Sequence, residues 1–67
     1  MEEFFQTLDE LYQAGDLTGV EAYLKANLEG RPGPEKVTVL NELAGFYRGV
    51  SRYSESEAAF LEVLELM

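Results

Sequence analysis

The sequence predicts an all-α fold of four helices, arranged as two stacked antiparallel helical hairpins in a single domain (hairpins 1–33 and 34–67). Apolar residues recur every three to four positions in four segments, and no segment alternates at period two for long enough to form a strand. A shift of 36 residues also places 21–29 over 57–65. Four pairs are identical in this register: Glu21/Glu57, Ala22/Ala58, Leu28/Leu64 and Glu29/Glu65. A period of this length is typical of stacked helical hairpins, which bury their apolar faces only against neighbouring repeats.

The first hairpin is predicted from two amphipathic segments and a turn. We expect the first helix from Glu2 to Ala14, closed by Gly15 in a left-handed conformation. Asp16 is the predicted N-cap of the second helix, which should end near Gly30. The apolar positions are Phe4, Phe5, Leu8, Leu11 and Tyr12 in the first helix, and the buried stripe Leu17, Val20, Leu24 and Leu28 in the second.

The second hairpin follows the break at 31–34. Pro34 has no amide hydrogen to lose at a first helical position, so the third helix should begin there and end near Gly49. Ser54 and Glu57 have the spacing of a capping box, which sets the fourth helix at Glu55 to Met67. The expected core residues are Leu40, Leu43, Ala44 and Tyr47, then Ala59, Phe60, Val63, Leu64 and Met67. Short linkers force consecutive helices to run antiparallel.

Composition excludes several classes of protein. The formal net charge is −8 with only five Lys and Arg residues, so a nucleic-acid partner is not expected. Six acids lie in or beside predicted first turns, where they favour the helix dipole: Glu2, Glu3, Asp16, Glu35, Glu55 and Glu57. The acidity is therefore explained either by solubility and helix starts or by an acidic docking surface. We find no signal peptide or membrane span in the sequence and expect a cytoplasmic protein.

No enzyme chemistry is predicted. The chain has neither His nor Cys and no glycine-rich phosphate loop, so we expect no cofactor, no metal site and no disulfide. A catalytic pair of Asp9 and Glu42 is geometrically conceivable, but two hairpins offer no closed pocket to exclude water. A chain this small is expected to need stabilisation by association.

The second half resembles a tetratricopeptide repeat. Its signature of large, small and aromatic residues is matched at Leu40, Leu43, Ala44, Tyr47, Tyr53, Ser56, Phe60 and Val63. The first half keeps Phe4, Leu11, the turn Gly15-Asp16, Leu24 and Pro32, and departs at Thr7, Leu8, Val20 and Asn27. The resemblance implies a right-handed solenoid fragment whose first helix in each hairpin lines a concave groove for a peptide or protein segment. Some family members hold a terminal carboxylate of the ligand with Lys, Asn and Arg side chains on these helices. Phe5 and Asp9 stand at two of those places here, so this carboxylate clamp is not expected.

Candidate groove residues are found on the first and third predicted helices. Phe5, Asp9 and Tyr12 are three to four residues apart and share one face. Asn41, Gly45 and Arg48 form the corresponding set on the third helix. Either Phe5 and Tyr12 grip a ligand beside the bare Gly45 backbone, or the two rings widen the core and Gly45 permits a close helix crossing.

The last helix carries more apolar residues than one neighbour can cover. Leu61, Leu64, Leu66 and Met67 form a predicted self-association surface. The alternatives are that a further hairpin covers this end, that the chain forms a homo-oligomer, with a dimer expected, or that the end frays in solvent. The leading function is therefore a protein-interaction module, and the second is a self-association element.

Overall fold

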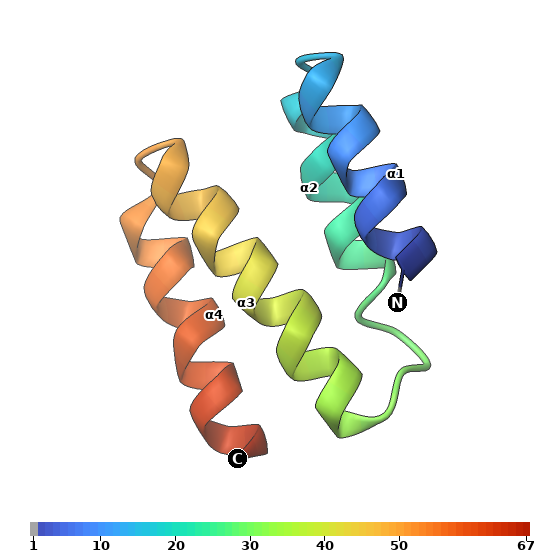
Figure 1. Cartoon of the computed structure of the whole chain (residues 1–67). Coiled ribbons are helices and arrows are strands. Elements are labelled where there is room, and N and C mark those ends of the chain that lie inside the picture. Colours follow the sequence, from blue (N-terminus) through green and yellow to red (C-terminus); the bar gives the residue numbers. More distant parts are fainter. Residues whose placement is uncertain (1) are drawn as a thin grey trace.

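The computed structural model describes residues 2–67, which form four α-helices (Figure 1). Their bounds are α1 Glu2–Gln13, α2 Leu17–Ala26, α3 Gly33–Gly49 and α4 Tyr53–Leu66. No strand occurs in this part of the chain, so the prediction of an all-α fold with four helices is confirmed. The Cα atoms extend over 33 × 27 × 14 Å. No helix among these residues is both long and apolar enough to cross a membrane.

The helices form two pairs joined through α2 and α3. The α1–α2 and α3–α4 pairs are each connected by a three-residue turn and run antiparallel (Figure 1). The contact between α3 and α4 is the most extensive, and between the pairs only α2 and α3 have Cα atoms within 8 Å. The backbones of α1 and α3, and those of α2 and α4, therefore stay further apart. Any contact between these helices is therefore made by side chains.

The turns repeat after 36 residues, although their residues differ. Gly15 has a φ of 72° and Ser51 has a φ of 64°, so serine adopts the left-handed conformation that glycine takes in the first turn. The Asp16 Oδ1 atom accepts a hydrogen bond from the Gly19 amide at 2.9 Å, which confirms the predicted N-cap. The prediction that α2 continues to Gly30 is wrong. The helix ends at Ala26 because Asn27 caps it, donating its side-chain amide to the Tyr23 carbonyl at 2.8 Å.

The start of α4 also differs from the prediction. Arg52 occupies the N-cap position, and Ser54 lies inside the first turn and makes no capping hydrogen bond, so the predicted capping box is absent. The Arg52 Nε atom instead donates to Glu55 Oε1 at 2.7 Å, which stabilises a helix that begins two residues early. The helix α3 begins at Gly33, one residue before the predicted Pro34, and ends at Gly49 as expected.

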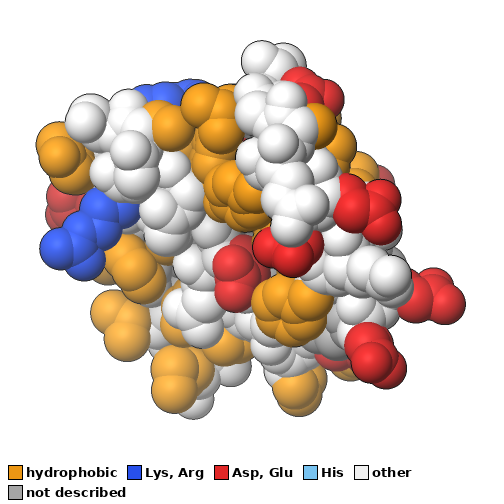
Figure 2. Space-filling view, turned by 45° about the horizontal axis from the view of Figure 1, so that its top comes forward, with side chains coloured by type: hydrophobic (Ala, Val, Ile, Leu, Met, Phe, Trp, Pro, Cys, Tyr) orange, Lys and Arg blue, Asp and Glu red, His pale blue; other side chains and the backbone are white. Residues whose placement is uncertain are grey.

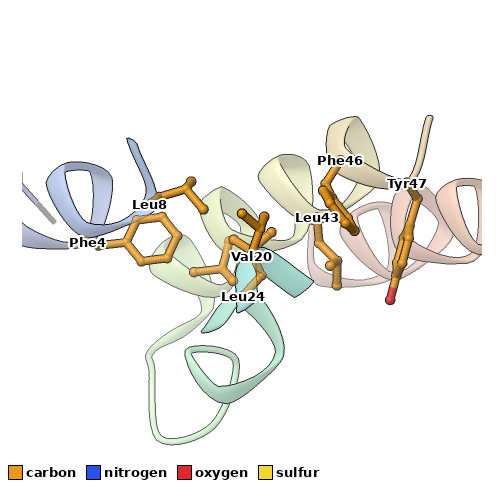
Figure 3. Close-up of a cluster of buried hydrophobic side chains, with 8 residues drawn as sticks. Phe4, Leu8, Val20, Leu24, Leu43, Phe46 and Tyr47 are labelled. Atoms are coloured by element: carbon orange, nitrogen blue, oxygen red, sulfur yellow. The ribbon is translucent and has the colours of Figure 1, made fainter. Parts of the chain in front are cut away.

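The main core lies between α1, α2 and α3 (Figure 3). It contains Phe4, Leu8, Val20, Leu24, Val39, Leu43, Phe46 and Tyr47. Val39 and Phe46 were not among the predicted core residues, although they lie one helical turn to either side of Leu43. Leu17 was predicted to be buried and is exposed instead, because it lies at the start of α2 beside the turn.

A second buried layer joins α3 to α4. Leu40 and Ala44 of α3 are buried, as are Ala59 and Val63 of α4. The buried Ser56 hydroxyl donates to the Ala44 carbonyl at 2.9 Å, which brings the two helices close. Phe60, Leu64 and Met67 were predicted as core and are exposed. The reason is geometric: α4 packs against α3 alone, so only a narrow stripe of α4 is covered.

Candidate protein-interaction site

A shallow groove of about 390 Å³ separates α1 from α3. We call this hollow the α1–α3 groove. It is lined by Phe5, Gln6, Leu8, Asp9 and Tyr12 on α1 and by Glu42 on α3. Figure 2 shows hydrophobic and acidic side chains next to one another near the centre of the face in view, with Lys and Arg only towards its edges. The lining combines aromatic rings with carboxylates and includes no basic residue.

The two aromatic side chains of α1 are half exposed. Phe5 is 42% and Tyr12 is 41% exposed, so neither ring is a core residue in the sense that Phe4 is. The Phe5 ring meets the Phe4 ring edge to face, with centroids 5.1 Å apart. Phe4 in turn stacks on Tyr23 of α2 at 5.6 Å. The exposed Phe5 ring therefore packs against a buried ring of the core.

Tyr12 lies beside the C-terminal half of α3. Its partial burial raises the pKa of the phenol, and the negative charge of Glu42 raises that pKa further. Tyr12 also lines a second hollow of about 270 Å³, together with Leu17, Gly45 and Val50. The two hollows share Tyr12, so they adjoin at this side chain.

Gly45 leaves the α3 backbone uncovered in the second hollow. A Cβ atom at Gly45 would meet no heavy atom within 4 Å. The alternative that Gly45 permits a close helix crossing is therefore wrong. A methyl group would fit there in the free protein, and helix propensity favours alanine by about 1 kcal/mol, so packing within the chain does not require this glycine.

The structure does not bring all six predicted groove residues together. Phe5, Asp9 and Tyr12 line the hollows on α1, and Gly45 lines them on α3. Asn41 and Arg48 are exposed but line neither hollow. The groove takes Glu42 in place of its neighbour Asn41, which is about 100° away around α3. The sequence analysis considered Glu42 only as a catalytic partner of Asp9, and the two acids line the same open groove.

A charged network connects α2 to α3 and to the α3–α4 turn, and so it holds the two helix pairs together. Glu21 accepts hydrogen bonds from Arg52 at 2.8 and 3.1 Å and from the Tyr47 hydroxyl at 3.0 Å, and Lys25 lies 3.1 Å away. The Arg52 guanidinium also lies 4.7 Å from the centre of the Tyr47 ring. Arg52 and then Lys25 lower the pKa of Glu21 to about 2. The sequence spacing indicated only the pair Glu21 and Lys25, because the other partners come from distant positions.

The predicted self-association residues are all exposed, but they do not share one face. By the helical spacing from the buried Ala59 and Val63, Leu64 lies on the flank of α4 turned away from α2, and Leu61 points away from α3. Met67 follows the end of this helix. Leu66 lies on the opposite flank, where it lines a hollow with Leu28 and Leu40. The predicted surface therefore separates into two.

No group of three His, Cys, Asp or Glu side chains within residues 2–67 is arranged to hold a metal ion. Comparison of the whole chain with models of known families, with curated proteins and with solved structures gives no match.

Proposed function

We propose that the chain is a protein-interaction module of the tetratricopeptide-repeat type, which binds a segment of a partner protein in the α1–α3 groove. The observation that carries this proposal is the pair of half-exposed rings, Phe5 and Tyr12, on one face of α1 with Asp9 between them. Partly exposed aromatic rings at the edge of a packed core are typical anchors for apolar side chains of a partner.

The charge of the groove indicates the chemistry of the partner. Asp9 and Glu42 line it from opposite helices, and no Lys or Arg lines it. A bound segment with Lys or Arg next to an apolar side chain would satisfy both features. Gly45 supports the same proposal, because its bare backbone lets a ligand approach α3 more closely than any other residue type would allow.

A selection from displayed random peptides of about ten residues tests the proposal. A peptide of this length spans roughly 33 Å when extended, which matches the longest dimension of the molecule. We expect the enriched sequences to pair a basic residue with an apolar one. Phe5→Ser and Tyr12→Ser should each weaken their binding by about tenfold or more while the helical circular dichroism stays unchanged.

Tyr53→Ser is the matched control, because Tyr53 is an exposed tyrosine outside the groove. It should leave binding unchanged. Selection of no peptide, or equal losses in Tyr53→Ser and Tyr12→Ser, would contradict the proposal. Loss of the helical signal in Phe5→Ser would instead assign that ring to the core.

Self-association through α4 is a second candidate, favoured by the exposure of Leu61 and Leu64. Light scattering measures it directly. If the chain associates through these two side chains, Leu61→Lys with Leu64→Lys should lower the mass to that of a monomer. Leu17→Lys, at a leucine of similar exposure on α2, should not. A wild-type chain that is monomeric throughout, or a double variant with unchanged mass, contradicts this candidate.

A further inference from the structure

A second depression lies on the side of α3 away from the α1–α3 groove. It consists of two adjoining hollows of about 420 and 260 Å³, which share Leu28, Leu40 and Glu62. We call it the α2–α4 cleft, because α2 with the turn that follows it forms one wall, α4 forms the other and α3 forms the floor. Leu40 and Glu42 are two residues apart on α3 and therefore about 160° apart around the helix axis. The cleft and the groove thus face opposite directions.

Much of the lining of the cleft is apolar. Leu28, Leu40, Leu43, Ala58 and Leu66 line it. The backbones of α2 and α4 do not approach within 8 Å, so no element among residues 2–67 fills the space. Between Glu55 and Leu66 the α4 wall runs for about 16 Å, the length of roughly eleven helical residues.

The charged residues that line the cleft are mostly acidic. Glu29, Glu62 and Glu65 line it, and none of the three forms an ion pair within residues 2–67. Two basic residues also line the cleft: Lys25, which lies 3.1 Å from Glu21, and Lys36, which forms no ion pair in the same part of the chain. An occupant that fits must therefore combine an apolar stripe with basic residues along its edge.

We propose that the α2–α4 cleft binds an amphipathic helix of another protein, with Lys or Arg beside its apolar stripe. A helix satisfies its own backbone hydrogen bonds, whereas an extended segment would place unpaired backbone groups over the leucine floor, where the neighbouring helices offer none in return. A second copy of this chain does not supply such a helix. The sequences of α1 and α4 contain no basic residue, α2 contains one, and α3 contains two that are twelve positions apart.

Two synthetic helical peptides of about 14 residues test the proposal with the full 67-residue chain. Both carry the same leucine stripe, flanked by lysines in one and by glutamates in the other. Fluorescence anisotropy should show the lysine peptide binding about tenfold or more tightly than the glutamate peptide. Amide chemical shifts should then change at Leu28, Leu40 and Leu66, and not at Phe5.

Charge reversal provides the decisive comparison. Glu62→Lys with Glu65→Lys should reverse the preference, so that the glutamate peptide binds more tightly. Glu2→Lys with Glu3→Lys changes the net charge equally on exposed positions of α1, and it should keep the preference for lysine. Phe5→Ser should also keep it, which separates this cleft from the proposed groove.

Three results would overturn the assignment. The first is that neither peptide binds saturably. The second is that the α1 variant reverses the preference as strongly as the α4 variant, and the third is that the chemical shifts change in the α1–α3 groove. The second result would mean that net charge alone attracts the peptide.

Discussion

Replacing Glu21 with glutamine removes the charge that Arg52, Lys25 and the Tyr47 hydroxyl share, while the shape of the side chain is kept. Glu21 is the point at which α2 is held to the α3–α4 turn, so the change acts on the contact between the two helix pairs. A glutamine oxygen still accepts the Tyr47 hydrogen bond. The loss is therefore confined to the interactions with the two cations.

The expected loss in the free energy of unfolding is about 1–2 kcal/mol. Hydrogen bonds to charged groups contribute about 1.5–3 kcal/mol when buried, and exposed ion pairs contribute about 0–1 kcal/mol. Glu21 lies between these limits, because its side chain is 19% exposed and that of Arg52 is 38% exposed. With an unfolding entropy of about 0.14 kcal/mol/K for a chain of this size, the melting temperature should fall by about 7–14 °C.

Thermal and urea unfolding, followed by circular dichroism, measures this loss. Glu57→Gln is the matched control, because Glu57 corresponds to Glu21 in the 36-residue register, is exposed and forms no ion pair within residues 2–67. Its melting temperature should change by less than about 3 °C. Equal shifts in the two variants would refute the assigned role of Glu21.

Acidification gives an independent test of the same network. The pKa of Glu21 in the folded chain is about 2, below the ordinary value of 4.5. Its stabilisation is therefore complete well above pH 4.5 and is lost as the pH falls towards 2. The difference between wild type and Glu21→Gln should narrow over this range. A difference that stays constant from pH 7 to about pH 2 would show that the charge of Glu21 is not its source.

The remaining predictions concern the turns, the α3–α4 contact and the groove. Ser51→Gly should raise stability in urea unfolding by about 0.5 kcal/mol, because glycine adopts a positive φ without the cost that serine meets; a loss would contradict this. Ser56→Ala should lower stability by about 1 kcal/mol through loss of the bond to the Ala44 carbonyl, whereas Ser54→Ala should change it by less than about 0.5 kcal/mol. A larger loss for Ser54→Ala than for Ser56→Ala would support the predicted capping box instead. Glu42→Gln should lower the pKa of Tyr12 in an NMR titration of ring-labelled tyrosine. An unchanged pKa would show that the charge of Glu42 does not act on Tyr12.

Local chemistry made the turn of the first hairpin predictable. The Asp16 cap depends on residues three apart, and the left-handed Gly15 depends on one residue, so a sequence window contains all the information needed. The Ser54–Glu57 capping box was equally well formed as a local pattern. It failed because Arg52 binds Glu55 in the same turn and Glu21, which is 31 positions away, and a sequence window contains no information about that distant partner.

The extent of burial on α4 could not be predicted, for a different reason. Its spacing of apolar residues correctly placed Ala59 and Val63 towards α3. The width of the covered stripe depends on how many helices pack against α4, and the sequence pattern does not contain that number. Phe60 and Leu64 were therefore assigned to the core although only α3 contacts this helix.

The candidate groove was predictable on one side only. The spacing of Phe5, Asp9 and Tyr12 places them on one face of α1 wherever that helix packs. Which α3 residues form the opposite wall depends on the rotation of α3 about its axis. An error of one residue in that rotation exchanges Asn41 for Glu42. That exchange replaces a neutral amide with a carboxylate, and so it changes the ligand charge that the groove favours.

The unequal support of α1 and α3 has a mechanical consequence for the proposed groove. The α3 wall is held by α2 on one side and by α4 on the other, whereas the backbone of α1 approaches α2 alone. Displacing α1 outwards therefore disturbs fewer packed surfaces than displacing α3. A binding groove with one rigid wall and one movable wall adjusts to the width of its ligand. It therefore selects ligands by charge and apolar content more than by shape.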